Sequence, residues 1–514
     1  MGTMGTRRMR GGVAAVMQRV LGIVVLSTLL VAGLPVGSQA ATQAVTIRDN
    51  SFTPQEIHIA PGDTVVWTNQ GSRVHDVTAD DRSFRSPDLG RQETYSHTFE
   101  KAGFYYYHCS FHGSRRKVGM WGLVVVGNPD PSTDPYKDLG GGDDERTRLV
   151  VPRDFPTIQK AVNRARPGST IVVRPGVYKT KVIVQEKRDL IIRGVDRFRT
   201  ILQGQDKKDV GITVDGSRNI TIANLTVRNY LRHGVFFNNT TGYTANRIDA
   251  IKDRTYGIYA FNSYDGVIKN SFTWGSGDGG VYIGNCLNCS GLIDNVTSKY
   301  NYLGYSGTNA TGVVIRDSLF AHNAAGIVPN TLPTEDFGPN RGTFVYNNVV
   351  RKNNYATVPA AGFSDNPIGI PIGTGIWFAG IENNIALNNT VSDHKSFGIL
   401  VSQSVDESLP VNNMVIGNLI RNSDIDGDGR GWDLAWDGTG ESNCFDDNRF
   451  EGASGPPDIE TVYACANRPY PGVPYPPVQA YLAESVTNSQ TREQKEPPEP
   501  KRPRCQRGAP GCHH

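Results

Sequence analysis

A chain of 514 residues is longer than one compact core usually supports, so we expect two or three domains. The 53 basic and 50 acidic residues leave a formal net charge of only +3, which argues against a nucleic-acid partner. With 57 glycines, 30 prolines and 38% hydrophobic residues, the composition favours many turns and strands over long helices, and we expect an all-β protein.

Residues 1–40 have the pattern of a secretory signal peptide. Three arginines stand between positions 7 and 10, an apolar run covers 20–34, and Ser38-Gln39-Ala40 offers a small-residue cleavage site. The run is shorter than the roughly 20 residues that a membrane span needs. We therefore expect a secreted or otherwise extracytoplasmic protein without a transmembrane span after signal removal, a membrane anchor being the alternative.

Residues 41–127 are expected to form the first domain. Alternating apolar residues over 45–48 and 57–59, followed by a tight turn at 61–63 and the run 64–68, are typical of short strands. No stretch of any length has helical periodicity. The segment therefore predicts a small β-sandwich.

The strand FYYYHC and the loop that follows it suggest a metal site. They carry Cys109, His112 and Met120, and His75 lies in an earlier loop. A thiolate, two imidazoles and a thioether are the ligands of a type 1 copper site, so we expect one copper ion at these four residues. His108 is adjacent to Cys109 but points to the opposite face of the strand, which suggests a structural role.

The segment APGDTVVWTN, the His75 loop and the YYYHCSFH loop resemble the cupredoxins of the plastocyanin and amicyanin type. The similarity covers nearly all of 44–127, although seven residues separate His112 from Met120, more than in the shortest loops of that family. The resemblance implies that His75, Cys109 and His112 are equatorial ligands and Met120 the axial one. It also implies outer-sphere electron transfer rather than chemistry on a substrate.

Three cations stand inside the metal loop, at Arg115, Arg116 and Lys117. Next to an electron port they would steer an acidic redox partner protein toward the site. A solvated hairpin tip is the alternative.

The seven cysteines suit an oxidising compartment. Apart from Cys109 they form three pairs that are close in sequence, and we expect disulfides at Cys286–Cys289, Cys444–Cys465 and Cys505–Cys512. Cys286-x-x-Cys289 has a redox or metal pair as an alternative.

Residues 128–150 are rich in Pro, Gly and Asp and are expected to be a linker, after which a repeat begins. A glycine followed by an apolar or aromatic residue recurs in steps of 22 to 24 residues, with one step of 49. This period indicates a solenoid over 151–455, preceded by a short helix that Thr157 can cap. The repeated glycines are Gly211, Gly234, Gly257, Gly280, Gly304, Gly326, Gly375 and Gly398.

An Asn or Asp stands between two apolar strands in each repeat. Such residues tolerate the left-handed conformation of a sharp corner, and stacked coils would join their amides into a ladder. Coil length, corner residues and capping helix resemble the right-handed parallel β-helix of the pectin-lyase-like proteins, over roughly 151–450. The expected corners are Asn224, Asn246, Asn270, Asn295, Asp317 and Asn418, with Asn347 or Asn348 and Asn388 or Asn389 between them.

Several activities occur among proteins that the solenoid resembles, including polysaccharide lyases, hydrolases, epimerases, non-catalytic binders and β-helix proteins of nitrous-oxide reductase maturation. No Asp-Pro-His triplet occurs, and no Asp cluster stands beside a clear Arg pair, so we predict no catalytic residue. We expect a copper electron carrier whose β-helix docks it or binds a polysaccharide or cell wall. The alternatives are an extracellular polysaccharide-active enzyme with an accessory copper domain and a copper-delivery protein.

The stretch DIDGDG at 424–429 resembles the start of a calcium loop, with Asp424, Asp426 and Asp428 at alternating positions. Ala435 stands where the loop needs its twelfth-position Glu, so an acidic turn is the favoured reading. Residues 456–514 are expected to form a Pro-rich C-terminal extension that is largely disordered toward its end.

Overall fold

The computed structural model describes residues 40–49, 51–114, 118–136, 147–355, 369–490 and 498, without the side chains of 111–114, 118–119 and 488–490. Residues 1–39 of the expected signal peptide, the triplet Arg115–Lys117 and the pair Cys505–Cys512 lie outside the described residues. Within these ranges, no helix combines the length and hydropathy that a membrane crossing requires.

The first domain is a β-sandwich of two four-stranded sheets, as predicted, with strand orders β2-β1-β4-β6 and β3-β8-β7-β5. Val65 and Trp67 on the alternating strand β4 enter the core, where Phe99 and Tyr107 also lie. The strands are β1 (Thr42–Arg48), β2 (Ser51–Thr53), β3 (Glu56–Ile59), β4 (Thr64–Asn69), β5 (Thr78–Ala79), β6 (Thr94–Thr98), β7 (Gly103–Ser114) and β8 (Val118–Val126), followed by the 3₁₀ turn η1 (Pro131–Thr133).

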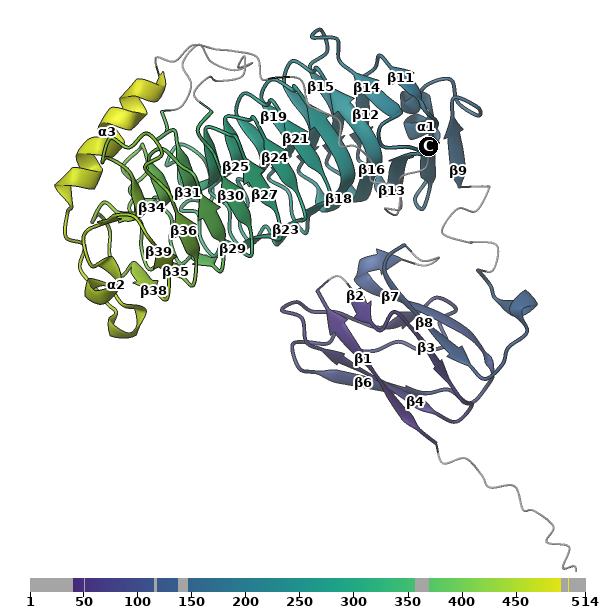
Figure 1. Cartoon of the computed structure of the whole chain (residues 1–514). Coiled ribbons are helices and arrows are strands. Elements are labelled where there is room, and N and C mark those ends of the chain that lie inside the picture. Colours follow the sequence, from purple (N-terminus) through teal and green to yellow (C-terminus); the bar gives the residue numbers. More distant parts are fainter. Residues whose placement is uncertain are drawn as a thin grey trace, which may run out of the picture.

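The second domain is a parallel β-helix, as predicted (Figure 1). Its first sheet consists of β12 (Val182–Gln185), β15 (Val210–Asp215), β17 (His233–Asn238), β19 (Tyr256–Phe261), β22 (Gly279–Gly284), β25 (Leu303–Thr308), β28 (Ala325–Asn330), β31 (Thr374–Ala379), β34 (Phe397–Ser402), β37 (Trp432–Trp436) and β40 (Ser454–Gly455).

Two further stacks of strands complete each coil, and the long strands β16 and β18 belong to both. The second stack consists of β9 (Arg148–Val151), β10 (Thr170–Val173), β13 (Arg188–Gly194), β16 (Arg218–Arg228), β18 (Thr241–Ile251), β20 (Val267–Lys269), β23 (Gly291–Asp294), β26 (Val313–Arg316), β29 (Phe344–Tyr346), β32 (Ile385–Leu387), β35 (Met414–Ile416) and β38 (Cys444–Asp446). The third adds β11 (Gly176–Tyr178), β14 (Thr200–Gln203), β21 (Phe272–Trp274), β24 (Thr297–Lys299), β27 (Leu319–Ala321), β30 (Val349–Arg351), β33 (Thr390–Ser392), β36 (Leu419–Arg421) and β39 (Arg449–Phe450).

The repeated glycines occupy the second position of successive strands in the first sheet. A Cβ atom on Gly234 would lie 2.7 Å from the carbonyl oxygen of Gly257, and one on Gly257 would lie 2.7 Å from that of Gly280. Because any side chain there would meet the next coil, glycine recurs once per coil. This steric column explains the period seen in the sequence.

The predicted corners adopt a left-handed backbone at Asn224, Asn270, Asn295 and Asp317 and also at Asn347 and Asn388. Two predictions were wrong by one residue, because Arg247 and Gly417 hold the corner in place of Asn246 and Asn418. The amide ladder is confirmed: Asn295 Nδ2 donates to Asn270 Oδ1 at 2.8 Å, and Asn270 Nδ2 to Asn246 Oδ1 at 2.9 Å.

Further ladders lie inside the coils, where a buried amide satisfies backbone groups that a turn would leave without partners. The position after the corner holds Asn348, Asn389, Asn418 and Asn448, and each Nδ2 donates to the next Oδ1 at 2.9–3.0 Å.

Helices close both ends of the solenoid. At its start, α1 (Ile158–Arg164) buries Ile158, Ala161 and Val162, and its predicted cap Thr157 accepts a hydrogen bond from Lys160 N. At its end stand α2 (Ile459–Val462), the 3₁₀ turn η2 (Cys465–Asn467) and α3 (Pro476–Gln490). The sequence analysis did not predict α3, which packs Val478 and Leu482 against the outer face of the first sheet.

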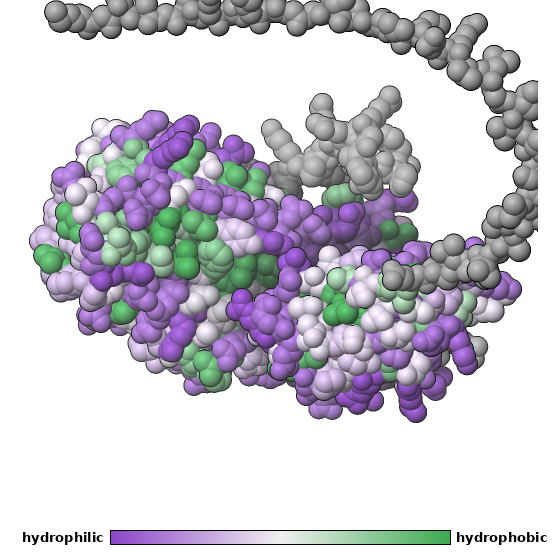
Figure 2. Space-filling model, turned by 90° about the horizontal axis from the view of Figure 1, so that it is seen from below, coloured by the Kyte–Doolittle hydropathy of each residue, from purple (hydrophilic) through white to green (hydrophobic). Residues whose placement is uncertain are grey.

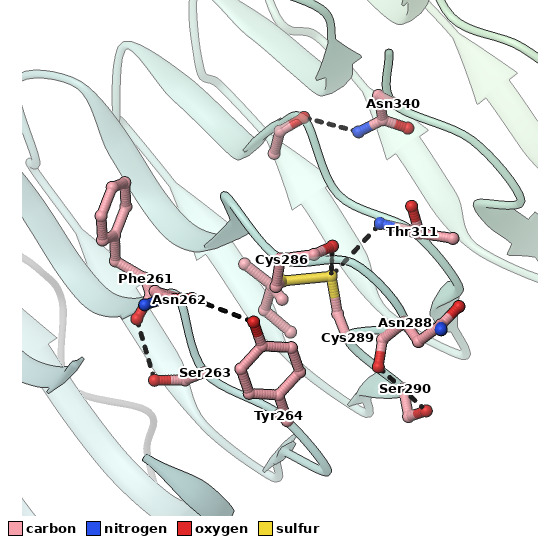
Figure 3. Close-up of a disulfide and its surroundings, with 12 residues drawn as sticks. Phe261, Asn262, Ser263, Tyr264, Cys286, Asn288, Cys289, Ser290, Thr311 and Asn340 are labelled. Atoms are coloured by element: carbon pink, nitrogen blue, oxygen red, sulfur yellow. Dashed lines mark hydrogen bonds between the residues drawn. A yellow bond between two sulfur atoms is a disulfide. The ribbon is translucent and has the colours of Figure 1, made fainter. Parts of the chain in front are cut away.

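The disulfides Cys286–Cys289 and Cys444–Cys465 are both formed, as predicted. Cys286–Cys289 closes the corner after β22, where Thr311 N donates to Cys289 Sγ (Figure 3). Cys109 is buried and belongs to neither of these two disulfides.

Candidate metal centre

The predicted copper ligands come from three segments of the sandwich. His75 lies between β4 and β5, Cys109 and His112 belong to β7, and Met120 belongs to β8. The antiparallel pairing of β7 and β8 is regular up to His108 and resumes at Gly113 after a register shift. Such an irregularity re-aims side chains at the end of a sheet, and here it falls on the predicted ligand loop.

The structure brings a thiol, an imidazole and a thioether into one buried cluster. Cys109 Sγ lies 3.5 Å from His75 Nδ1, and both side chains are fully buried. Met120 is 2% exposed and belongs to the same cluster of core residues as Cys109. The sulfur–nitrogen distance is within the span of two metal–ligand bonds of about 2.0–2.3 Å each. The side chain of His112 lies outside the described residues.

A carboxylate lies near the second ring nitrogen of His75. Its Nε2 lies 3.8 Å from Oδ1 of Asp49, a carboxylate that accepts hydrogen bonds from Ser72 N at 2.6 Å and Arg73 N at 3.2 Å. Burial alone would raise the pKa of Asp49, but the hydrogen bonds from Ser72 and Arg73 outweigh it and the pKa is lowered. The charged carboxylate therefore favours the tautomer with the proton on Nε2, which leaves the lone pair of Nδ1, on the side of the thiol, available to a metal.

Asp76 connects the two ligand segments, and the sequence analysis did not identify it. Its fully buried carboxylate accepts Ser110 N at 2.5 Å and Ser110 Oγ at 2.7 Å. Thr78 Oγ1 donates to it as well, at 2.9 Å. The residue after His75 is thus bonded to the residue after Cys109. The signal in the sequence was an acidic residue that directly follows a candidate ligand.

His108 faces away from the site. Its Nδ1 lies 2.6 Å from Oδ1 of Asp80, whose other oxygen accepts a hydrogen bond from Tyr136 OH at 2.9 Å. Tyr136 also places its ring 4.6 Å from that of Tyr106. The first part of the expected linker, up to residue 136, therefore packs on the sandwich, because it carries an aromatic anchor.

The donor chemistry of this cluster fits copper. Soft thiolate and thioether sulfur with imidazole nitrogen suits Cu(I) and Cu(II), whereas magnesium and calcium prefer oxygen. Among the side chains that the structure describes, no group of three or more His, Cys, Asp and Glu residues is placed to hold a metal ion. The candidate therefore depends on Cys109, His75 and Met120 with the loop that carries His112.

The three acids of the candidate calcium loop turn to different partners. Asp424 accepts a hydrogen bond from Gly429 N at 3.0 Å, and Asp428 accepts one from Arg430 N at 2.9 Å. Asp426 forms an ion pair with Lys395 at 2.9 Å. Backbone amides and a lysine contact these carboxylates, as expected of an acidic turn, and the calcium site stays a prediction.

Two family models match this chain. Residues 21–120 match the model described as a cupredoxin-like domain, and residues 163–366 match the model of the periplasmic copper-binding protein NosD. Amicyanin from Paracoccus denitrificans is 33% identical over 87 residues, which is 16% of this chain and 63% of amicyanin. The chain thus spans less than two thirds of that relative.

Solved structures similar to parts of the chain include both kinds of domain. A purple cupredoxin from Nitrosopumilus maritimus is 31% identical, covering 16% of this chain and 99% of that one, with a TM-score of 0.15. The A-module of the mannuronan C-5 epimerase AlgE4 from Azotobacter vinelandii is 14% identical, covering 58% of this chain and 91% of that one, with a TM-score of 0.41.

Proposed function

Because this chain joins a cupredoxin-like domain to a parallel β-helix that matches the NosD model, we propose that it is an extracytoplasmic copper-binding protein that carries electrons. The 3.5 Å approach of His75 Nδ1 to the buried Cys109 Sγ is the observation that supports the proposal best. The same proposal assigns His112 and Met120 as the remaining ligands.

The residues of the site favour electron transfer over substrate chemistry. When bound, copper supplies a one-electron couple between Cu(I) and Cu(II). His75 and Cys109 are fully buried, so the core excludes water from them. The bonds of Asp49 and Asp76 hold both ligand segments in place, which limits rearrangement between oxidation states. The β-helix then serves as the body that carries and docks this domain.

The test is the visible spectrum of the full chain loaded with Cu(II). We expect intense thiolate-to-copper absorption that is lost in Cys109→Ser and retained in His108→Ala, since His108 bonds to Asp80 instead. Bound copper without this absorption would contradict the proposal.

Reversible reduction separates an electron carrier from a copper-delivery protein. We expect copper to stay bound through repeated cycles of reduction and oxidation in the presence of a Cu(I) chelator. Quantitative loss of Cu(I) to the chelator on reduction would favour delivery.

We further propose that the redox partner is an acidic protein that meets Arg115, Arg116 and Lys117. These positions lie outside the described residues, and the support is their charge beside the ligand loop. The electron-transfer rate should fall as ionic strength rises, because salt screens long-range attraction. A rate independent of salt would contradict this docking site.

A further inference from the structure

The outer face of the third stack of strands carries a tryptophan that is buried although it points out of the coil. In β21 the middle residue, Thr273, is fully buried and faces the interior, so Trp274 faces outward. Trp274 is nevertheless only 8% exposed, whereas Lys299, its neighbour in the next coil, is half-buried. A tryptophan in this position must be covered from outside the coil.

A distant segment of the chain provides part of that cover. Trp274 Nε1 donates a hydrogen bond to the carbonyl oxygen of Pro498 at 2.9 Å, across 224 positions of sequence. The rings of Tyr300 and Phe272 lie beside the indole, with centroids 4.3 and 5.7 Å from it. Because an indole N–H can only donate, and a buried one needs an acceptor, the carbonyl of Pro498 satisfies the one polar group of Trp274.

Trp274 stands in a groove on the outer face of the third stack. One part, of about 980 Å³, extends over β14, β16, β18, β21 and β24, and a second part, of about 470 Å³, is lined by Tyr300 and His322 among others. Tyr300 joins the two parts, since it contacts Trp274 and stacks on His322 with centroids 5.1 Å apart. We call the combined surface the Trp274 groove. Its strands lie side by side along the solenoid (Figure 1).

The second part of the groove extends toward helix α3. Ile425 lines it, and Arg430 of the same loop forms an ion pair with Glu484 of α3. Helix α3 ends at Gln490, and Pro498 follows eight positions later. The Trp274 groove therefore begins beside the helix from which the C-terminal extension continues.

The Trp274 groove is cationic. Strand pairing places Arg228, Trp274, Lys299 and Arg351 in one outward column. In the described part of the chain, Lys299 and Arg351 form no ion pair. Burial, and then the charge of Arg351, lower the pKa of Lys299. The groove thus holds positive charge that acidic side chains of a ligand could neutralise.

The sequence around Pro498 has the composition that such a surface fits. Residues 496–500 read Glu-Pro-Pro-Glu-Pro. Proline favours the polyproline II conformation, in which backbone carbonyls have no internal partner and are free to accept a hydrogen bond. Aromatic grooves bind proline-rich segments well because this preformed conformation has little entropy to lose. Glu496 and Glu499 on either side of the proline pair supply the negative charge.

We propose that the Trp274 groove is a peptide-binding site for proline-rich acidic segments, and that residues 496–500 of this chain are its occupant. The carbonyl of Pro498 binds Trp274, proline rings pack on Trp274 and Tyr300, and the two glutamates pair with cations such as Lys299 in charge-assisted hydrogen bonds. The site fastens the C-terminal extension to the solenoid. It shares no residue with the predicted copper ligands, so it is independent of the copper function.

The test uses a full-length, metal-free variant whose own segment is altered by Pro497→Gly, Pro498→Gly and Pro500→Gly together with Glu496→Gln and Glu499→Gln. We call it the open-groove variant. It should bind a fluorescein-labelled peptide of residues 493–500 saturably, measured by fluorescence anisotropy. The unaltered chain should bind the same peptide at least tenfold more weakly, because its own segment occupies the groove.

Two groove substitutions in the open-groove variant locate the peptide. Trp274→Ala should weaken binding at least tenfold, and Lys299→Met, which keeps the apolar stem and removes the charge, at least threefold. The matched control is Tyr346→Ala, an outward aromatic residue of β29 in a different stack, which should leave the affinity unchanged. Equal melting temperatures would show that folding is preserved, and Lys299→Met decides the matter if Trp274→Ala does not fold.

A peptide with its three prolines replaced by alanine keeps the charges and should bind at least tenfold more weakly. Three outcomes would overturn the proposal: no binding to the open-groove variant, equal binding to the unaltered chain, and equal binding of the alanine peptide, which would make the groove an unspecific site for acidic chains. The copper absorption of the full chain is measured separately, so failure of the peptide site leaves the copper proposal standing.

Discussion

The buried carboxylate of Asp76 holds two segments of the candidate metal centre together. It receives two hydrogen bonds from Ser110 and one from Thr78 while fully buried, and it joins the segments of two predicted ligands. Removing it leaves the Ser110 amide without its acceptor, and a donor stranded in this way costs about 1–3 kcal/mol.

We therefore expect Asp76→Ala to lower the free energy of unfolding of the metal-free protein by about 1–3 kcal/mol, measured by urea denaturation. Asp81→Ala is the control, because the Asp81 carboxylate is exposed and bonds only within its own turn, to Ser83. Equal stability of the two variants would contradict a bracing role for Asp76.

His394 occupies a position inside the solenoid where preceding coils have asparagine. Asn353 N donates to its Nδ1 at 3.4 Å, and its Nε2 lies 3.3 Å from the carbonyl oxygen of Val350. A neutral ring that is protonated at Nε2 satisfies both partners. Burial lowers the pKa of His394 to about 4, although the contacts with Val350, Asp393 and Asp433 oppose this.

Because the folded pKa lies below the ordinary value near 6.5, the unfolded chain takes up the proton first. The stability contributed by neutral His394 is thus complete above about pH 6.5 and is lost as the pH falls toward 4. We expect His394→Asn to reduce the loss of stability over this range, measured by thermal unfolding. His322→Asn, at a half-buried outer corner, should change the profile less.

How well an element could be predicted depends on whether the residues that determine it lie close together in the sequence. The glycine column and the corner residues belong to single coils and repeat, so the solenoid and its period were readable from the sequence. Asn418 lies one residue after the true corner, at the buried position inside the coil, which also favours asparagine. Asn246 lies one residue before the true corner, because Arg247 takes the corner that asparagine holds in other coils. The sequence could suggest copper ligands because three of the four predicted residues stand on one loop.

Elements that depend on distant partners were missed. The sequence of helix α3 does not by itself predict a helix. The helix is held in place by Val478 and Leu482, which pack against residues such as Phe397 and Leu400. Tyr136 holds residues of the expected linker through Asp80, which is far away in sequence. Asp76 was not predicted for the same reason, since its partner Ser110 lies on another strand.

The two disulfides close loops of different length and should differ in their contribution to stability. Cys444 and Cys465 are 21 residues apart, whereas Cys286 and Cys289 are 3 apart. In the chain-entropy model these loops correspond to about 3 and about 2 kcal/mol. We expect the double Cys→Ser variant of the long loop to melt at the lower temperature, measured by calorimetry. The reverse order would show that packing at the buried corner of Cys286–Cys289 outweighs loop length.

At the scale of the whole molecule, the copper domain lies beneath the first coils of the solenoid with β2 and β7 on the side nearest to it (Figure 1). Arg73, two residues before His75, forms an ion pair with Asp265 of the β-helix. Its backbone N–H binds Asp49, the carboxylate beside His75.

On the underside of the solenoid, half-buried apolar residues gather along β20, β23, β26 and β29, including Val267, Leu292, Val314 and Phe344 (Figure 2).

A surface ion pair contributes at most about 1 kcal/mol and is screened by salt. We therefore expect Asp265→Asn to separate the domains, seen as a larger radius of gyration in small-angle X-ray scattering. High salt should have the same effect on the unmodified protein. Asp294→Asn is the matched control, because Asp294 pairs with Arg316 of the same domain, on the outer surface of the solenoid. An unchanged radius of gyration in Asp265→Asn would show that other contacts hold the domains together.

The glycine column has a consequence for how the chain can change over time. Each coil meets only its two neighbours, so stability is close to a sum over coils, and α1 and the C-terminal cap need not change when one is gained or lost. Duplication of a single coil would lengthen the solenoid by about 4.8 Å. The length of the solenoid is therefore counted in whole coils, and a gene can alter it by copying about 23 codons in frame.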